Sequence, residues 1–363
     1  MKKIFLFLFL LLFLFTILPN CTKKDSTPTS PLSTSTSVNS VVVTITQIHT
    51  NTITSTLTNT ATITVTHTST LTPTFTSTNT PSYTPSFTPS NTPCNIIVNF
   101  PDPNLEYIIR QTIKKPIGDI CASDLVGIVV LDCNGKNIYD ITGIEYCINL
   151  QVLKLESNQI SNINPLNSLT NLKIIFLGSN NINSILPLSS LTNLIYLDLN
   201  SNNISNIMPL STLYNLRELY LDNNKISNIQ ALNSLTNLQY LGLSYNKINN
   251  IEPLETLTNL QFLNLSSNNI TDISALSNLI NLYHINLSNN NISNISSFSV
   301  LLNLMEIYLF NNNISDITAL VTNCNSGGLG SGDIVYLNNN NLNSQAINTH
   351  IPYLQSKGVY IEY

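Results

Sequence analysis

The sequence predicts an α/β solenoid in which short parallel β-strands form a concave sheet and 3₁₀ or short helical turns form the convex side. Two observations lead to this fold class. From Leu153 onward, leucine and isoleucine recur at a spacing of 22 residues, and one asparagine keeps that spacing in eight successive units. A unit of this length cannot enclose its own apolar side chains, so stacked copies have to bury them together. We therefore expect a right-handed solenoid with one continuous core.

Each unit has the form Leu-x-Leu-x-x-Asn-x-Ile, as at Leu153, Leu155, Asn158 and Ile160. Side chains alternate along a strand, so the two leucines point into the core and their neighbours point out. The asparagine comes after the strand, where its two N–H donors and one acceptor can bond backbone groups that have lost their strand partners. This asparagine ladder comprises Asn158, Asn180, Asn202, Asn224, Asn246, Asn268, Asn290 and Asn312.

The second half of the unit carries proline at Pro165, Pro187, Pro209 and Pro253. Proline fixes φ where the chain enters the convex side, which favours a 3₁₀ turn there. Together with the segment Pro165-Leu166-x-x-Leu169-Thr170-Asn171-Leu172, the unit resembles the leucine-rich repeat, in the 22-residue subclass found in the internalins of bacterial surfaces. The resemblance covers about three quarters of the chain. It implies a cell-surface protein that adheres to another protein, such as a host receptor.

The resemblance also places the ends of the array, which need caps because a terminal coil exposes an apolar face. Residues 94–128 include Phe100 through Ile113 and then Ser123-Asp124-Leu125, which together resemble the helical N-terminal cap of internalin-type domains. Residues 129–334 contain the repeats, and residues 335–363 are expected to form a C-terminal capping repeat.

The last coils depart from the 22-residue spacing. Asn340 follows Asn312 by 28 residues, so six residues are inserted near 324–332, in a glycine-rich segment that we expect to be a flexible loop. After it, Ser344 is expected to N-cap a helix that runs to about Gln355. Gly358 ends that helix, and residues 359–363 are expected to form a closing strand.

The chain begins with the pattern of a secretory signal peptide over residues 1–20. Lys2 and Lys3 precede an apolar run of about 15 residues that Pro19 ends, which is shorter than the roughly 20 residues of a membrane-spanning helix. The segment Leu18-Pro19-Asn20-Cys21 resembles the lipobox of bacterial lipoproteins, although Asn20 stands where a small residue is usual. The resemblance implies lipidation of Cys21; the alternative is an ordinary signal or an uncleaved anchor with an incidental cysteine.

Residues 21–93 are expected to form a disordered linker. A stretch that is more than half serine and threonine cannot bury enough apolar surface to offset the conformational entropy lost on folding. From Pro81 a four-residue repeat beginning with proline favours extended polyproline geometry. Residues 44–66 alternate threonine with apolar residues, which fits either a low-complexity stalk that accepts O-linked glycans or a β-prone segment that self-associates.

Composition argues against several classes of function. Charged residues make up 9% of the chain and the net charge is -5, so no basic field exists to neutralise nucleic-acid phosphates. Only four histidines occur, and only His284 and His350 lie beyond the threonine-rich tract. Nothing in the sequence supports a catalytic constellation, a cofactor or a metal site, so we expect a protein that is not an enzyme.

Five cysteines follow Cys21, and they are Cys94, Cys121, Cys133, Cys147 and Cys324. Export permits disulfides, but an odd number leaves at least one thiol unpaired. Cys133 and Cys147 occupy leucine positions of the repeat and are expected to be small buried apolar residues. A bridge between Cys94 and Cys121 that pins the cap is an alternative to two free thiols.

The outward strand positions predict the binding site on the concave face. They are aromatic and mildly acidic, and the candidate partner-binding residues are Phe176, Tyr196, Asp198, Glu218, Tyr220, Asp222, Tyr240, Tyr245, Phe262, His284, Glu306, Tyr308 and Phe310. Strands stand about 4.8 Å apart, so rings on consecutive coils should form one patch. The alternative is that tyrosine and phenylalanine merely suit exposed strands.

These observations favour an exported, monomeric protein that binds a host or envelope protein and touches a membrane only through its lipid anchor at the cell envelope. Without lipidation of Cys21 it would be secreted. A structural envelope protein that self-assembles through the solenoid is the alternative.

Overall fold

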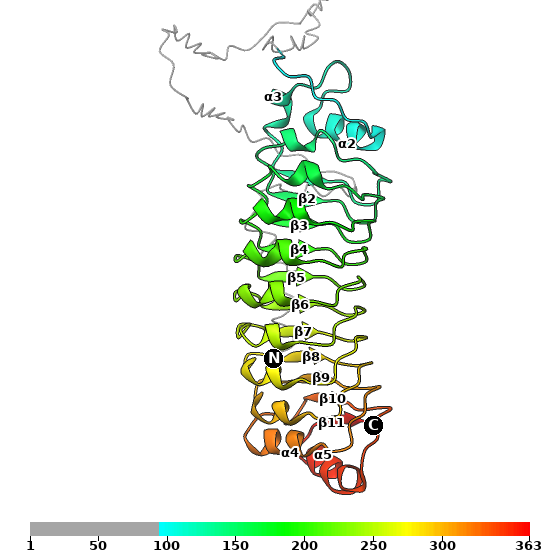
Figure 1. Cartoon of the computed structure of the whole chain (residues 1–363), viewed down its shortest axis with the longest axis vertical. Coiled ribbons are helices and arrows are strands. Elements are labelled where there is room, and N and C mark those ends of the chain that lie inside the picture. The colour runs from blue at the N-terminus through cyan, green and yellow to red at the C-terminus, as the bar shows by residue number, and fades with distance from the viewer. Residues whose placement is uncertain (1–93) are drawn as a thin grey trace, which may run out of the picture. The chain divides into compact units, whose positions relative to one another are not determined.

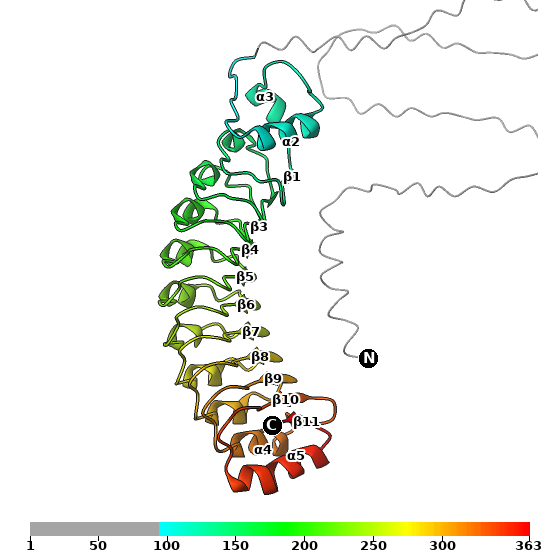
Figure 2. The ribbon, with the colours of Figure 1, turned by 90° about the vertical axis from the view of Figure 1, so that its right-hand side faces the viewer.

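A computed structural model describes residues 94–363; the predicted signal peptide, Cys21 and the linker over residues 21–93 lie outside the described residues. The described residues form a stack of coils that share one eleven-stranded parallel sheet, with the strands in sequence order from β1 to β11 (Figure 1). The strands lie along the inner side of the curved stack and the helical turns along the outer side (Figure 2). The predicted leucine-rich-repeat solenoid is confirmed.

Each strand is three residues long. The strands are β1 (Val130–Asp132), β2 (Val152–Lys154), β3 (Ile174–Phe176), β4 (Tyr196–Asp198), β5 (Glu218–Tyr220), β6 (Tyr240–Gly242), β7 (Phe262–Asn264), β8 (His284–Asn286), β9 (Glu306–Tyr308), β10 (Ile334–Tyr336) and β11 (Tyr360–Glu362). From β1 to β9 the register pairs residues 22 apart, as in Leu197 with Leu219. The step from β9 to β10 pairs Ile307 with Val335 and so contains the six inserted residues.

The convex side consists of short 3₁₀ helices, as the prolines predict. They are η2 (Ile144–Tyr146), η3 (Asn164–Leu166), η4 (Leu186–Ser190), η5 (Met208–Thr212), η6 (Gln230–Ser234), η7 (Glu252–Leu254), η8 (Ser274–Asn278) and η9 (Ser296–Val300). The four prolines stand in the first turn of η3, η4, η5 and η7. Because proline has no N–H to leave unpaired, it suits that position.

The asparagine ladder makes the contacts that its donor and acceptor groups allow. In a central coil, Asn202 Nδ2 donates to the carbonyls of Leu177 and Leu199 over 3.0 and 3.1 Å. Its Oδ1 accepts from the backbone N–H of Ile182 over 3.0 Å. The next ladder residue, Asn224, also donates to the carbonyl of Leu199. Each asparagine therefore bonds its own coil and the preceding one, as predicted.

Two features of the coil were not predicted. The residue before each ladder asparagine has a left-handed backbone, for example Ser201 with φ of 54° and Tyr245 with φ of 52°. A second row of asparagines follows each 3₁₀ turn and donates to a carbonyl 23 residues earlier, as Asn237 Nδ2 does to the carbonyl of Tyr214 over 2.8 Å. This row holds the convex sides of neighbouring coils together.

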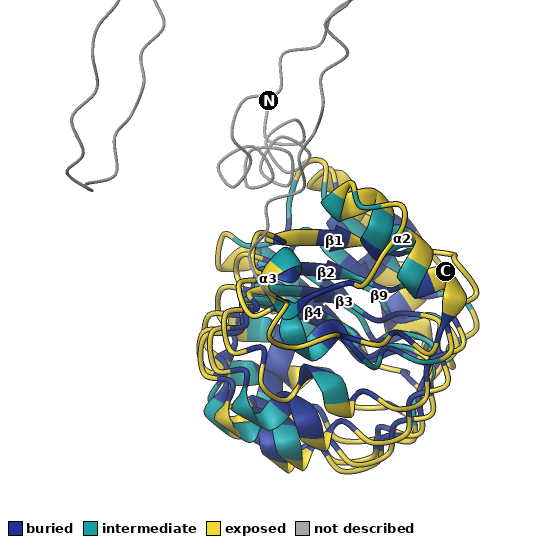
Figure 3. Ribbon diagram, turned by 90° about the horizontal axis from the view of Figure 1, so that it is seen from above, coloured by how far each residue is buried: buried dark blue, intermediate teal, exposed yellow. Residues whose placement is uncertain are grey.

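The core runs without a break through the stack, and Figure 3 shows buried segments inside the coils and exposed ones outside. Leu243 and Phe298 are both fully buried.

Cys133 and Cys147 are fully buried free thiols, which confirms that they serve as small apolar residues. Burial raises the pKa of each thiol to about 12, so both stay protonated and unreactive.

The N-terminal cap contains α2 (Pro103–Ile113) and α3 (Ala122–Leu125), in the region where a helical cap was expected. Asp102 is fully buried at the start of α2, where its Oδ1 accepts from the N–H groups of Asn104 and Leu105. Its Oδ2 accepts from the N–H of Tyr139 in the first coil over 2.8 Å. One carboxylate therefore caps the helix and joins the cap to the repeats.

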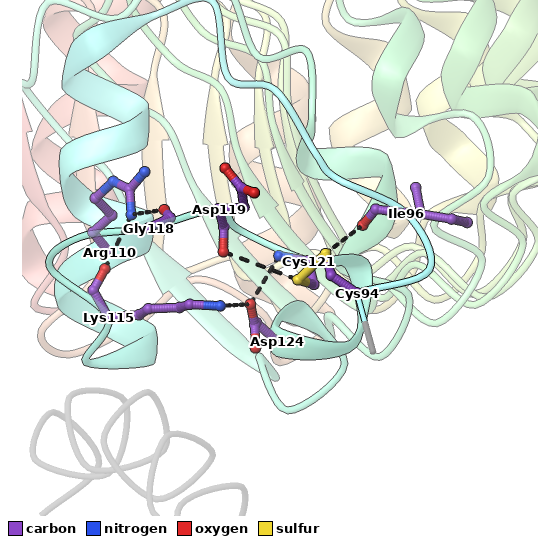
Figure 4. Close-up of a disulfide and its surroundings, with 8 residues drawn as sticks. All are labelled: Cys94, Ile96, Arg110, Lys115, Gly118, Asp119, Cys121 and Asp124. Atoms are coloured by element: carbon purple, nitrogen blue, oxygen red, sulfur yellow. Dashed lines mark hydrogen bonds and ion pairs between the residues drawn. A yellow bond between two sulfur atoms is a disulfide. The ribbon is translucent and has the colours of Figure 1, made fainter. Parts of the chain in front are cut away.

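A disulfide joins Cys94 to Cys121, which selects one of the two alternatives left open by the sequence (Figure 4). Next to it, the N–H of Cys121 donates to Asp124 Oδ2, and Lys115 Nζ lies 2.7 Å from the same oxygen. The disulfide holds Cys94 at the start of α3, and the ion pair joins Lys115, just after α2, to Asp124 of α3.

At the C-terminal end, α4 (Thr318–Asn325) takes the place of a 3₁₀ turn, and the glycine-rich insertion follows it. The insertion packs against the coil, because Leu329 is buried and its N–H donates to Asn323 Oδ1 over 2.8 Å.

The expected closing helix begins as the π-helical turn η10 (Ala346–His350) and continues as α5 (Ile351–Ser356). The predicted N-cap was wrong by one residue, because Asn343 Oδ1 rather than Ser344 accepts from the N–H of Ala346. Gly358 and β11 close the array as expected.

No helix within residues 94–363 combines the length and the apolar character needed to cross a membrane. Over the same residues, no group of three or more His, Cys, Asp or Glu side chains is placed to hold a metal ion.

Candidate protein-binding face

The strands place almost every predicted site residue on the concave face. All of these residues except Tyr245 are half-buried, because each lies beside the strand of the next coil while one side faces outward. The half-buried residues are Phe176, Tyr196, Asp198, Glu218, Tyr220, Asp222, Tyr240, Phe262, His284, Glu306, Tyr308 and Phe310. The sheet therefore presents one surface of aromatic and acidic groups along its inner side.

The aromatic rings form two runs instead of the single patch that we expected. The N-terminal aromatic run consists of Phe176, Tyr196 and Tyr220, with successive ring centroids 4.6 and 5.6 Å apart. The C-terminal aromatic run consists of Tyr240, Phe262, His284, Tyr308, Tyr336 and Tyr360, whose successive centroids lie 4.3 to 6.4 Å apart. Tyr220 is in register with Gly242, whose missing side chain separates the two runs.

Sequence reasoning missed the last two rings of the C-terminal aromatic run. Tyr336 stacks on Tyr308 with centroids 4.9 Å apart, and Tyr360 lies 6.2 Å beyond it. The six inserted residues break the 22-residue spacing after β9, so a fixed period does not reach these positions. Aligning Val335 with Ile307 through the core pattern would have found them.

His284 lies in the middle of the C-terminal aromatic run. Its ring stacks on Phe262 with centroids 4.3 Å apart and planes inclined by 11°, and its Nδ1 lies 3.1 Å from Glu306 Oε2. Burial lowers the pKa of His284, while the hydrogen bond to Glu306 opposes that shift. At neutral pH the imidazole is therefore uncharged and acts as another flat ring of the surface.

Carboxylates flank the N-terminal aromatic run. Glu218 Oε2 accepts from the Tyr220 hydroxyl over 3.1 Å, and Asp198 Oδ1 accepts from the N–H of Asn200 over 2.8 Å. Asp222 Oδ1 accepts from both the N–H and the hydroxyl of Ser244. These bonds hold the acidic groups in fixed positions beside the rings.

Burial raises the pKa of the acidic groups in this region. For Asp198, burial together with the nearby charges of Glu156 and Asp222 raises the pKa to about 6, against the hydrogen bond from Asn200. Burial also raises the pKa of Glu218 and of Asp222. Tyr196 and Tyr220 have raised pKa values because of burial and neighbouring carboxylates. A group that stays ionised here at an energetic cost would gain from a cation brought by a ligand.

Tyr245 differs from the other predicted residues. It is 64% exposed and lies after β6 at a left-handed backbone position, where the other coils have glycine, serine or asparagine. A bulky side chain is uncommon at such a position. Tyr245 therefore stands at the edge of the face rather than within either aromatic run.

Comparison with known proteins identifies the family. The family described as "Leucine Rich repeats (2 copies)" matches residues 192–234, 214–258, 236–278 and 258–300. The solved structure of internalin C2 from Listeria monocytogenes is 38% identical over 59% of this chain and 94% of that chain, with a TM-score of 0.56.

The chain belongs to the internalin-like leucine-rich-repeat family.

Two further structures share the fold. The functional domain of InlJ from Listeria monocytogenes, which includes a cysteine ladder, is 24% identical over 72% of this chain and 59% of that chain, with a TM-score of 0.56. The leucine-rich-repeat ectodomain of the plant receptor kinase GASSHO1/SCHENGEN3 from Arabidopsis thaliana, solved in complex with CASPARIAN STRIP INTEGRITY FACTOR 2, is 22% identical over 64% of this chain and 29% of that chain, with a TM-score of 0.54. No curated protein matches the sequence.

The internalin-like fold is that of a surface module for protein interaction rather than of an enzyme. Its stacked strands give this chain a wide face, and the outward strand residues on that face differ from coil to coil.

Proposed function

We propose that this internalin-like protein is exported, tethered to the cell envelope through lipid on Cys21, and adheres as a monomer to another protein through its concave face. The observation that carries the binding role is the set of nine rings in the two aromatic runs, which lie on consecutive strands and remain open to a partner. Aromatic side chains are the commonest interface anchors because they bury a large area with few rotatable bonds.

Further support comes from the repeat and from a relative. The strand register pairs residues 22 apart, which favours the 22-residue subclass of the internalins. The plant ectodomain that shares the fold was solved in complex with CASPARIAN STRIP INTEGRITY FACTOR 2. The proposal assigns the same general role, recognition of a protein, to the present chain.

Replacing Tyr240 with alanine should weaken partner binding by about 1 to 3 kcal/mol, or roughly 5- to 150-fold in Kd. The Tyr240 ring is half-buried on the face, so its loss removes contact area without opening the core. The partner can be captured by photo-crosslinking from a benzoyl-phenylalanine at position 262 and its affinity for each variant then measured by calorimetry.

Tyr214→Ala is the matched control, because Tyr214 is 56% exposed on the convex side. Equal losses from Tyr214→Ala and Tyr240→Ala would move the binding site away from the concave face. If the purified protein instead forms larger species as its concentration rises in size-exclusion chromatography, self-assembly replaces partner binding as the role of the solenoid.

Replacing Cys21 with alanine should release the protein from the membrane fraction and abolish labelling by a fatty-acid analogue. The acyl chains on a lipidated cysteine provide the membrane affinity in this proposal, and two or more chains are needed for stable anchoring. Cys324→Ala is the control that changes one thiol elsewhere. Membrane retention of Cys21→Ala without label would exclude the lipoprotein assignment.

A further inference from the structure

Beside the N-terminal aromatic run the concave face has a hollow of about 480 Å³. The residues that line this acidic hollow include Asn134, Glu156, Gly178, Asp198 and Asn200. Gly178 creates it, because the neighbouring coils carry Glu156 and Asn200 at the equivalent position. A Cβ on residue 178 would lie 3.3 Å from Asp198 Oδ1, so a larger side chain would fill the space next to that carboxylate.

Asp198 stands between two rings in one row of the sheet. The strand register places it directly opposite Phe176 on β3 and opposite Tyr220 on β5. Phe176 and Tyr220 are therefore the neighbours of Asp198 on the two adjacent strands, and a cation that reaches either ring face is attracted to it. The row already contains one such contact, because Lys154 Nζ lies 5.9 Å from the centroid of the Phe176 ring.

The charges of this region are unbalanced. Four carboxylates, those of Glu156, Asp198, Glu218 and Asp222, lie at the outward positions at and after β2, β4 and β5. Lys154 is the basic residue among the outward positions of β2 to β5, and it lies 3.4 Å from Asp132 Oδ2. Two more basic residues, Lys173 and Arg217, precede β3 and β5 and so stand at the other end of the strands from the acidic hollow.

Two of the acidic groups have an oxygen free for a ligand. Glu156 uses Oε2 to accept from Asn134 Nδ2 over 2.7 Å, and Asp198 uses Oδ1 to accept from the N–H of Asn200. Among the described residues, Glu156 Oε1 and Asp198 Oδ2 have no hydrogen-bond partner. An arginine or lysine side chain has several N–H donors and can bond to an oxygen of this kind.

We propose that the partner of the concave face binds through a segment that carries lysine or arginine, with one cationic side chain seated in the acidic hollow and paired with Asp198. This inference rests on the proposed function, because it names the chemistry of the protein that the face binds. Aromatic rings alone could stack on either a polypeptide or a neutral glycan. The negative charges of the acidic hollow favour a basic polypeptide over a neutral glycan.

The binding should depend on pH. Asp198 has a raised pKa of about 6, and it is faced by Glu156, Asp222 and Tyr196. Deprotonation between pH 5 and pH 7.5 supplies the charge that the cation needs, so affinity for a basic segment rises over that range, by up to about 10-fold for a single group with this pKa. Asp198→Asn removes this dependence.

The test uses the full-length chain purified in detergent and three labelled peptides. One peptide repeats Lys-Ser-Tyr, the second has every lysine acetylated, and the third has glutamate in place of lysine. Fluorescence anisotropy should show that the lysine peptide binds at least 10-fold more tightly than either of the others. Its affinity should fall about 10-fold in Asp198→Asn and fall again as salt is raised from 50 to 300 mM.

Two further variants separate charge from space. Gly178→Val keeps every charge but fills the acidic hollow, and it should weaken the lysine peptide as much as Asp198→Asn does. Glu255→Gln, on the exposed convex side, removes the same charge elsewhere and should leave the affinity unchanged. Equal binding of the acetylated peptide, or binding of a neutral oligosaccharide in place of the lysine peptide, would overturn the inference.

Failure of this inference can be told apart from failure of the proposed function. If the captured partner loses affinity for Tyr240→Ala but binds Asp198→Asn as tightly as the parent, the basic segment is excluded while the concave face remains the binding site. If both variants bind the partner like the parent, the proposed function itself is wrong.

Discussion

Replacing Leu243 with alanine is expected to lower the free energy of unfolding by about 2 to 5 kcal/mol. Leu243 is fully buried directly after β6, near the middle of the stack. Its truncation removes three carbon atoms from the core and leaves a cavity that the flanking coils can fill only in part, because each coil is fixed to its neighbours by strand pairing and by the asparagine ladder.

The measurement is urea unfolding of parent and variant, followed by circular dichroism. Thr236→Ala is the control, since Thr236 is exposed on the convex side and its carbonyl, which accepts from Asn259 Nδ2, is unchanged by the substitution. Stability in a repeat array depends on the contacts between neighbouring coils, so the loss at Leu243 should also make the transition less cooperative. A parent-like curve for Leu243→Ala would mean that this side chain is not interior.

The fold could be predicted because each residue type in the repeat has one physical role. Leucine at alternate strand positions, asparagine after the strand and proline at the convex turn all indicated the same coil, and agreement among local signals is what specifies a structure. The inward residues were correct in every coil for the same reason. What one coil buries, the next coil buries at the equivalent position.

Features that rest on contacts between coils were harder to predict. The second row of asparagines, such as Asn237, was visible in the sequence, but its bond to the carbonyl of Tyr214 depends on how closely the convex turns stack. The disulfide between Cys94 and Cys121 could not be chosen from the sequence, because several pairings of five cysteines were open. The left-handed residue before the ladder carries serine, asparagine or tyrosine, so its identity gave no clear signal.

The candidate site was predictable by position but not by arrangement. Alternation along the strands correctly placed Tyr196 and Tyr220 on the concave face of the sheet, pointing away from the core. It did not show that Gly242 would divide the rings into two runs or that Gly178 would open a hollow beside Asp198. Those features arise where side chains of three neighbouring strands meet, and a pattern read along one strand does not contain them.

The ladder asparagine should not be replaceable by aspartate, although the two side chains have nearly the same shape. In Asn202→Asp, Oδ1 can still accept from the N–H of Ile182, but a carboxylate oxygen replaces the amino group that faces the carbonyls of Leu177 and Leu199. The side chain is 8% exposed. A buried charge facing acceptors without a compensating partner is expected to cost about 3 to 5 kcal/mol at pH 7.5.

The pH dependence of that loss identifies its cause. The folded state disfavours the carboxylate, so the pKa of the introduced carboxyl group should be higher in the folded variant than its usual value of about 3.9 in the unfolded chain. Below about pH 4 both states are protonated and the acid can donate one hydrogen bond, which leaves the variant close to the parent. As pH rises the unfolded state releases its proton first, so stability falls until the folded group also ionises.

Urea unfolding of parent, Asn202→Asp and Asn202→Ala at several pH values checks this, because only the aspartate variant should lose stability relative to the parent as pH rises. A difference between Asn202→Asp and the parent that does not change with pH would mean that the ladder side chain reaches solvent and that its amide donors are not needed inside the coil.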